Sequence, residues 1–193
     1  MGVSIYVEGL VNIRMGLKTS ISRAGWNFVA DICKIMGWEE IPWQEPSEVR
    51  GLVTSRSYGT YNLLLKIALA ADPNSPPYRL DGGIICDCKS TVFPQLLDRD
   101  IYRNIYVPFD LPDPVVHGDS EGNTSFTIGS VVRYSQELDK LAPYLQPDFI
   151  KQAFQADEIE TARILDLMED LVKILRVGIE DSLRLKLPLL VSW

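Results

Sequence analysis

The last quarter of the chain, residues 147–193, decides the fold. It reads PDFIKQAFQADEIETARILDLMEDLVKILRVGIEDSLRLKLPLLVSW. Hydrophobic side chains recur at intervals of three and four residues up to about Arg184, which is the spacing of one buried helix face. A weak point at residues 155–157 divides this pattern into a short helix and a long one. We therefore predict that the longest helix of the protein lies near the C-terminus.

The two ends of the chain both have strand-like patterns. The final segment, LKLPLLVSW (185–193), is extended and apolar, which predicts a final strand or a docked tail. Pro188 indicates a sheet edge, because proline cannot donate a ladder hydrogen bond. At the other end, Val3, Ile5 and Val7 show the period-two pattern of a strand with one buried face. A sheet that joins both ends predicts a single globular domain over residues 1–193.

The middle of the chain alternates between helical and extended patterns. Helices are predicted near residues 21–36, 57–71, 94–97 and 131–145, and strands near 80–89, 105–111 and 126–128. Pro108 places the 105–111 strand at an edge or ends it early. Residues 110–123 read as an exposed loop. The predicted fold is α+β, with a mixed or mostly antiparallel sheet of about four to five strands packed against four to five helices.

Charge and composition narrow the classes of partner. The net charge is −7, from 19 basic and 26 acidic residues. This sign opposes nucleic-acid phosphates and anionic lipids, so we expect neither direct nucleic-acid binding nor membrane contact. The N-terminus, MGVSIYVEGL, does not resemble a secretory leader. We expect a cytoplasmic protein with reduced thiols.

Several motifs that would indicate an enzyme are missing from the sequence. It contains no G-x-x-x-x-G-K-[ST] loop, no G-x-G-x-x-G after a strand and no H-E-x-x-H. We therefore predict no cofactor and lean against an enzyme. The weak catalytic candidates are Cys86 and Cys88 with His117, the only histidine, since a thiolate nucleophile needs a neighbouring base. Two small buried residues in a strand is the alternative for the cysteines.

A second set of candidates concerns metal binding. One segment combines carboxylates with the histidine, and such ligands suit divalent cations; the set is Asp113, His117, Asp119 and Glu121. Their spacing matches no calcium-binding loop. A flexible acidic loop is the favoured interpretation, so no metal is predicted.

Two acidic regions are candidates for protein binding. The segment GWEEIPWQEP (37–46) carries Trp38, Glu39, Glu40 and Trp43, and tryptophan is enriched at interface hot spots. The alternative is that these tryptophans fold back over the core. Residues 148–184 hold nine acids and five bases, a net charge of −4. This face is interpreted first as solvated surface and second as an acidic docking face.

Three functions remain open at this level. The first is a non-enzymatic protein-binding module with an acidic face, immunity- or antitoxin-like in charge and size, whose partner is a basic protein. The second is a small hydrolase or ligand-binding enzyme that uses Cys86, Cys88 and His117. The third is a homo-oligomeric structural protein, such as a homodimer paired through an edge strand.

Overall fold

The structure is a computed structural model, and it describes residues 2–8, 33–34, 36–41, 50–74, 90–98, 103–118 and 125–192. One six-stranded sheet has the order β2-β1-β6-β3-β5-β4. Its strands are β1 (Gly2–Glu8), β2 (Arg50–Ser57), β3 (Arg103–Val107), β4 (Val115–Gly118), β5 (Ser125–Ser130) and β6 (Leu189–Ser192). The β3 and β5 strands run parallel, and the other neighbours are antiparallel. The predicted α+β class and mixed sheet are confirmed, with one strand more than expected.

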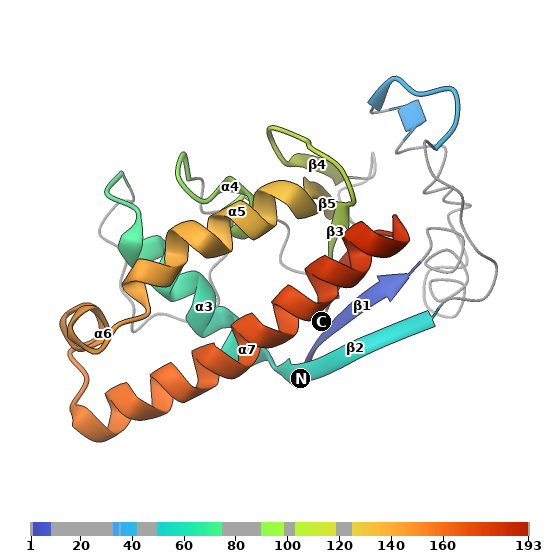
Figure 1. The fold of residues 1–193 in the computed structure, drawn as a ribbon. Coiled ribbons are helices and arrows are strands. Elements are labelled where there is room, and N and C mark those ends of the chain that lie inside the picture. Colours follow the sequence, from blue (N-terminus) through green and yellow to red (C-terminus); the bar gives the residue numbers. More distant parts are fainter. Residues whose placement is uncertain are drawn as a thin grey trace.

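Helices of the described chain pack against this sheet. They are α3 (Tyr58–Ala71), α4 (Pro94–Leu97), α5 (Val131–Leu141), α6 (Pro147–Phe154) and α7 (Glu158–Leu185), with a 3-10 turn at Ala142–Tyr144. In Figure 1, α7 crosses in front of β1 and β2, and α5 lies beside it. The α7 helix contacts β1, β2 and β6, whereas α5 contacts β3 and β5. Within the described chain, no helix is both long enough and apolar enough to cross a bilayer.

Side-chain caps explain where three of these helices begin. The Ser57 hydroxyl accepts a hydrogen bond from the N–H of Thr60 at the start of α3, and Ser130 does the same for Arg133 in α5. Asp157 caps α7 in the same way. The predicted break between α6 and α7 is confirmed, because Gln155 adopts a left-handed conformation with φ 53°.

The sheet joins the two ends of the chain. The β6 strand lies between β1 and β3, with Val191 opposite Ile5 and Leu190 opposite Ile105. Val3, Ile5 and Val7 are all buried, as their alternation predicted. The expectation that the C-terminal segment forms a strand beside the N-terminal one is therefore confirmed, whereas a single domain over residues 1–193 stays a prediction.

The proline-based edge assignments are wrong. Both β3 and β6 are interior strands, and the edges are β2 and β4. Pro108 directly follows the last residue of β3, and Pro188 directly precedes the first residue of β6. Neither proline occupies a ladder position, so neither removes a hydrogen bond from the sheet. The other half of the Pro108 expectation, an early end to the strand, is confirmed.

Other differences concern short or weakly patterned segments. The predicted loop at residues 110–123 contains β4, which pairs with β5. The β2 strand, RGLVTSRS, was not predicted, because it lacks a clear period-two alternation. Most of the expected 21–36 helix and the 80–89 strand lie outside the described residues.

Candidate functional site

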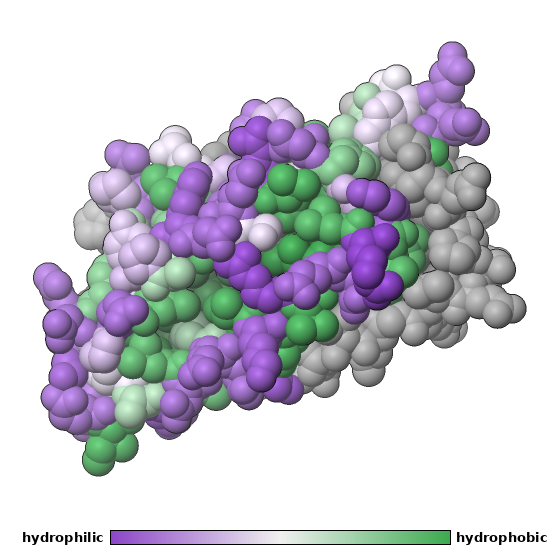
Figure 2. Space-filling view, viewed as in Figure 1, coloured by the Kyte–Doolittle hydropathy of each residue, from purple (hydrophilic) through white to green (hydrophobic). Residues whose placement is uncertain are grey.

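The longest helix, α7, has one apolar side and one charged side. Its buried residues are Thr161, Ile164, Met168, Leu171, Leu175, Gly178, Ile179 and Ser182. Carboxylates gather on the rest of α7 and on the preceding α6 turn. We call this the acidic surface, and its members are Asp148, Asp157, Glu158, Glu160, Asp166, Glu169, Asp170, Glu180 and Asp181. All are exposed except the half-buried Asp181, and Figure 2 shows hydrophilic side chains following both helices.

Basic side chains pair with part of the acidic surface. Lys151 of α6 lies 2.5 Å from Glu158, and Arg56 of β2 lies 3.4 Å from Asp170. Arg184 pairs with Asp181 at 2.5 Å, three residues away, in place of the Glu180 that its i, i+4 spacing suggested. Exposed pairs of this kind stabilise a fold only slightly, but each one offsets a negative charge.

Four exposed carboxylates of α7 have no ion-pair partner in the described structure. They are Glu160 in the first turn and, further along the helix, Asp166, Glu169 and Glu180. Asp166 and Glu169 are three residues apart and therefore neighbours on the helix surface. Glu180 lies about 21 Å beyond Asp166 along the helix axis, at a rise of 1.5 Å per residue. The uncompensated charge is therefore spread along the helix.

Exposed apolar side chains lie on the same helix. Ile159 is 82% exposed and Val177 is 46% exposed, and they are the large hydrophobic residues classed as exposed in the described part of the chain. Val177 is a neighbour of Glu180 on the helix surface, because the two are three residues apart, whereas Ile159 lies in the first turn between Glu158 and Glu160 in the sequence. A protein that contacts α7 would therefore meet both charge and apolar surface.

A buried carboxylate connects the neighbouring α5 to α4. Both side-chain oxygens of Glu137 accept backbone hydrogen bonds, from Gln95 and from Leu96, each at 2.9 Å. Burial raises the pKa of Glu137 to about 8, and the two backbone N–H groups oppose this shift. At neutral pH the group is mostly protonated, so it adds little to the surface charge.

The structure describes only part of the catalytic candidate site. Cys86 and Cys88 lie outside the described residues. His117 belongs to β4, where its backbone stands opposite Phe126 of β5. The proposed thiol site therefore stays a prediction.

The metal candidates are also only partly described. Asp113 is exposed, whereas Asp119 and Glu121 lie outside the described residues. Arg133 donates two hydrogen bonds to the nearby Asp110, which lowers the pKa of that carboxyl. The hydrogen bond to Asp110 and, to a smaller extent, the charge of Asp113 raise the pKa of Arg133. The Arg133 cation therefore already offsets negative charge in this loop. Among the described residues, no group of three or more potential ligands is arranged to hold a metal.

The aromatic binding candidate Trp38 packs against another aromatic side chain and is partly buried. Its ring meets Phe109 edge to face, with centroids 4.9 Å apart, and it is half-buried. Glu39 and Glu40 beside it are exposed, and Trp43 lies outside the described residues. Trp38 thus follows the alternative in which the tryptophan folds back, while a partner site at Glu39 and Glu40 stays a prediction.

Sequence reasoning identified the acidic character of residues 148–184 but ranked docking second to solvation there. The signal was the charge count over the segment. What it could not supply was which of these carboxylates form ion pairs, because the pairing of Asp170, for example, depends on Arg56, which folding brings in from β2.

A protein-family model described as "Putative DNA-mimic protein" matches residues 3–187. Comparisons with curated proteins and with solved structures gave no match. The family match contradicts the immunity- or antitoxin-like hypothesis and the enzyme hypothesis, because the family is described by imitation of DNA. The protein-binding character predicted from the acidic sequence agrees with that description.

The partner hypothesis also needs correction. A basic protein partner fits the family description, but the expectation that nucleic acid plays no part does not, because DNA is what a mimic imitates. The match extends from β1 to the residues just before β6 and includes the whole of α7. The chain therefore belongs to the family described as "Putative DNA-mimic protein".

Proposed function

We propose that this protein acts as a DNA mimic, and that its acidic surface occupies the DNA-binding site of a partner protein. The observation that carries the proposal is the family match over residues 3–187, which includes every residue of the acidic surface. A cytoplasmic location, which the sequence predicts, would bring the chain together with such partners.

The charge arrangement supports this function physically. DNA-binding sites present Lys and Arg to phosphates, and a carboxylate accepts the same charge-assisted hydrogen bonds from these side chains. Asp166, Glu169 and Glu180 are free of internal ion pairs in the described structure, so their charge is available to a partner. The packing of α7 on β1, β2 and β6 holds these groups on a supported helix.

The unpaired carboxylates of α7 are spaced more widely than the phosphates of a DNA strand. A 21 Å length of B-DNA carries about six phosphates on one strand, at 3.4 Å each. The same length of α7 offers three unpaired carboxylates. We therefore expect the binding of this protein to its partner to weaken less steeply with added salt than the binding of DNA to that partner. Ile159 and Val177 can add contacts that salt does not screen.

A competition experiment tests the proposal. DNA-binding proteins of the source cell are enriched on immobilised duplex DNA, eluted with salt, and passed at low salt over this protein on a solid support. Any retained protein is purified, and its binding to labelled duplex DNA is measured with increasing amounts of this chain. We expect displacement of the DNA. A retained protein that binds the chain and the duplex simultaneously, or no retained protein, contradicts DNA mimicry.

Two matched variants locate the surface that binds. The first replaces three of the unpaired carboxylates of α7: Asp166→Asn, Glu169→Gln and Glu180→Gln. The second removes the same number of charges elsewhere: Glu39→Gln, Glu40→Gln and Asp113→Asn. We expect the first variant to weaken partner binding by about tenfold or more and to flatten its salt dependence, because each good charge-assisted contact is worth about 1 kcal/mol or more. Equal losses in both variants, or a larger loss in the second, contradict the placement on α7.

A further inference from the structure

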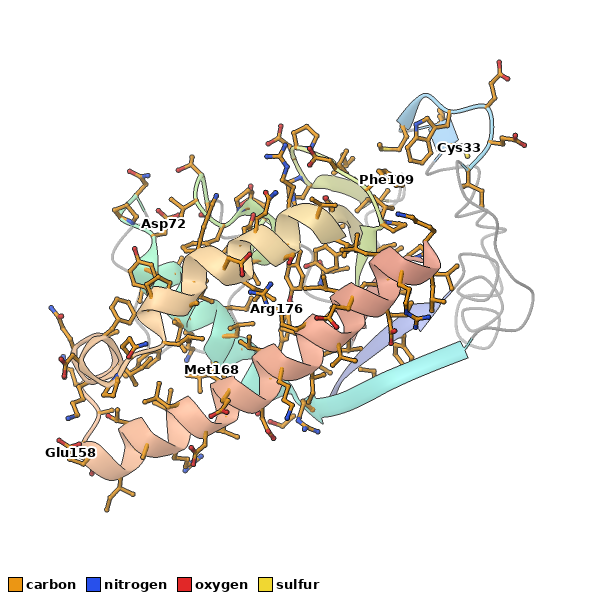
Figure 3. All side chains as sticks on the ribbon, in the orientation of Figure 1. Cys33, Asp72, Phe109, Glu158, Met168 and Arg176 are labelled. Atoms are coloured by element: carbon orange, nitrogen blue, oxygen red, sulfur yellow. The ribbon has the colours of Figure 1, made fainter. Side chains whose placement is uncertain are left out.

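One partly buried basic side chain of α7 reaches across to α5. The Arg176 guanidinium donates to the carbonyl oxygen of Ser135 at 3.2 Å and to its hydroxyl at 2.9 Å. Its second terminal nitrogen donates to Asp139 at 2.5 Å. Figure 3 shows Arg176 between the two helices. This side chain is 29% exposed, and the Asp139 side chain is 70% exposed.

Arg176 differs from the other cations near the acidic surface. Lys173, one turn earlier, is exposed and forms no ion pair in the described structure. Arg184 pairs within α7 itself. Arg176 instead connects α7 to a separate helix through three acceptors, and a planar guanidinium holds such a fork more rigidly than an ammonium can.

The flanks of α7 are tied to different elements. On one flank Arg56 of β2 reaches Asp170, and at the start of the helix Lys151 of α6 reaches Glu158. Arg176 supplies the corresponding tie to α5. It lies between Glu169 and Glu180, so it sits in the stretch whose unpaired carboxylates must keep their spacing.

We propose that Arg176 is a positioning residue of the acidic surface. It fixes α7 against α5, so that the carboxylates of α7 are already held in place when a partner binds. This inference rests on the proposed function. A surface that is ordered before binding loses less entropy on binding, which raises affinity without adding contacts.

The direction in which one substitution changes the affinity for the partner distinguishes a positioning role of Arg176 from a purely electrostatic one. Arg176→Met keeps an unbranched apolar stem and removes the cation. If Arg176 only offsets negative charge, its removal tightens binding to a basic partner. If it positions α7, its removal weakens binding, and we expect a loss of about fivefold. Lys173→Met is the matched control, and we expect it to tighten binding, because it removes a cation with no positioning contact.

A double-mutant cycle tests whether Arg176 acts through its partner on α5. Arg176→Met, Asp139→Asn and the double variant are compared for affinity toward the purified partner. We expect the double variant to bind no more weakly than the weaker single variant, since both remove the same tie. Tighter binding by Arg176→Met, or effects that simply add, overturn the inference.

Hydrogen exchange of the free protein supplies a readout that needs no partner. We expect Arg176→Met to increase amide exchange in residues 135–141 and 169–180 by about fivefold, the factor that corresponds to the net contribution of one typical hydrogen bond. Amides of α3 serve as the internal control and should keep their rates. Unchanged exchange in α5 and α7 overturns the positioning role even where DNA mimicry holds. Increased exchange without any partner binding contradicts the proposed function alone.

Discussion

The carboxylate of Glu137 accepts a hydrogen bond from the backbone N–H of Gln95, 42 residues earlier in the chain, at a distance of 2.9 Å. Its other oxygen accepts from Leu96, so one side chain of α5 holds the start of α4. Tyr106 donates its hydroxyl hydrogen to the carbonyl of Gln95, and the Gln95 side chain accepts from the N–H of Ser130. These bonds connect α4, α5, β3 and β5.

The Glu137 carboxyl should make stability depend on pH. Its pKa is about 8 in the fold, above its ordinary value of 4.5, and the larger cause is burial. The folded state therefore binds the proton more tightly than the unfolded state does. The contribution to stability is fully present below pH 4.5 and is lost as the pH rises toward 8, with a slope of up to about 1.4 kcal/mol per pH unit.

Urea unfolding at pH 5, 6, 7 and 8 measures this slope against Glu137→Gln. The glutamine cannot titrate, and its amide turns a donor toward the backbone N–H groups. We expect the variant to be less stable at pH 5 by about 1 to 3 kcal/mol, and this difference to vanish or reverse by pH 8. A constant difference across this range contradicts the raised pKa.

Gly129 should tolerate no side chain. A Cβ placed there would lie 2.5 Å from Oε1 of Gln95 and 2.8 Å from Cδ1 of Tyr106, both in the packed interior. We expect Gly129→Ala to lower the free energy of unfolding by about 1 to 3 kcal/mol. Gly59→Ala is the matched control, because its Cβ would approach only the Ser57 hydroxyl, at 3.8 Å. This change in α3 should stabilise the fold by about 0.5 to 1 kcal/mol.

The Ser130 hydroxyl caps α5 and should contribute more to the free energy of unfolding than an exposed capping residue does. Its oxygen accepts from the N–H of Arg133, and the hydroxyl donates to the carbonyl of Phe109 at 2.6 Å. Ser130 is fully buried, whereas the capping residue Ser57 of α3 is exposed. We expect Ser130→Ala to cost about 2 kcal/mol and Ser57→Ala about 1 kcal/mol, measured by urea unfolding. Equal losses would indicate that the Phe109 contact adds nothing.

Replacement of Lys186, at the C-terminal end of α7, by glycine should stabilise the protein. Lys186 has φ 57°, and its backbone N–H donates to the carbonyl of Ser182. A left-handed conformation costs a residue with a Cβ about 1 kcal/mol relative to glycine. We expect Lys186→Gly to raise the melting temperature. Lys173→Gly, which removes the same side chain inside the helix, should lower it.

Local patterns predicted the helices of the C-terminal half well. Their starts depend on Ser130 and Asp157, which lie next to the residues they cap. The break at Gln155 was predicted from the weakening of the hydrophobic pattern over a few residues. Such features need only short-range information, because a helix bonds residues four positions apart.

Strand positions were predicted less completely. The alternation in β1 identified its buried side, but the weak pattern of β2 gave no signal. Pro108 and Pro188 suggested edges, although both strands lie inside the sheet. The rule behind these assignments concerns residues within a ladder, and the sequence could not show that each proline stands one residue outside it.

The sequence by itself determined the amphipathic α7, its acidic outer side, and the strand character of both chain ends, because these follow from the periodicity and the charges of neighbouring residues. Only the tertiary structure decided which charges remain available. Arg56 and Asp170 are 114 residues apart, and Arg176 and Asp139 are 37 apart, yet each pair forms a contact once the elements pack. Asp166, Glu169 and Glu180 remain unpaired in the described structure, whereas folding brings Arg56 of β2 to the nearby Asp170.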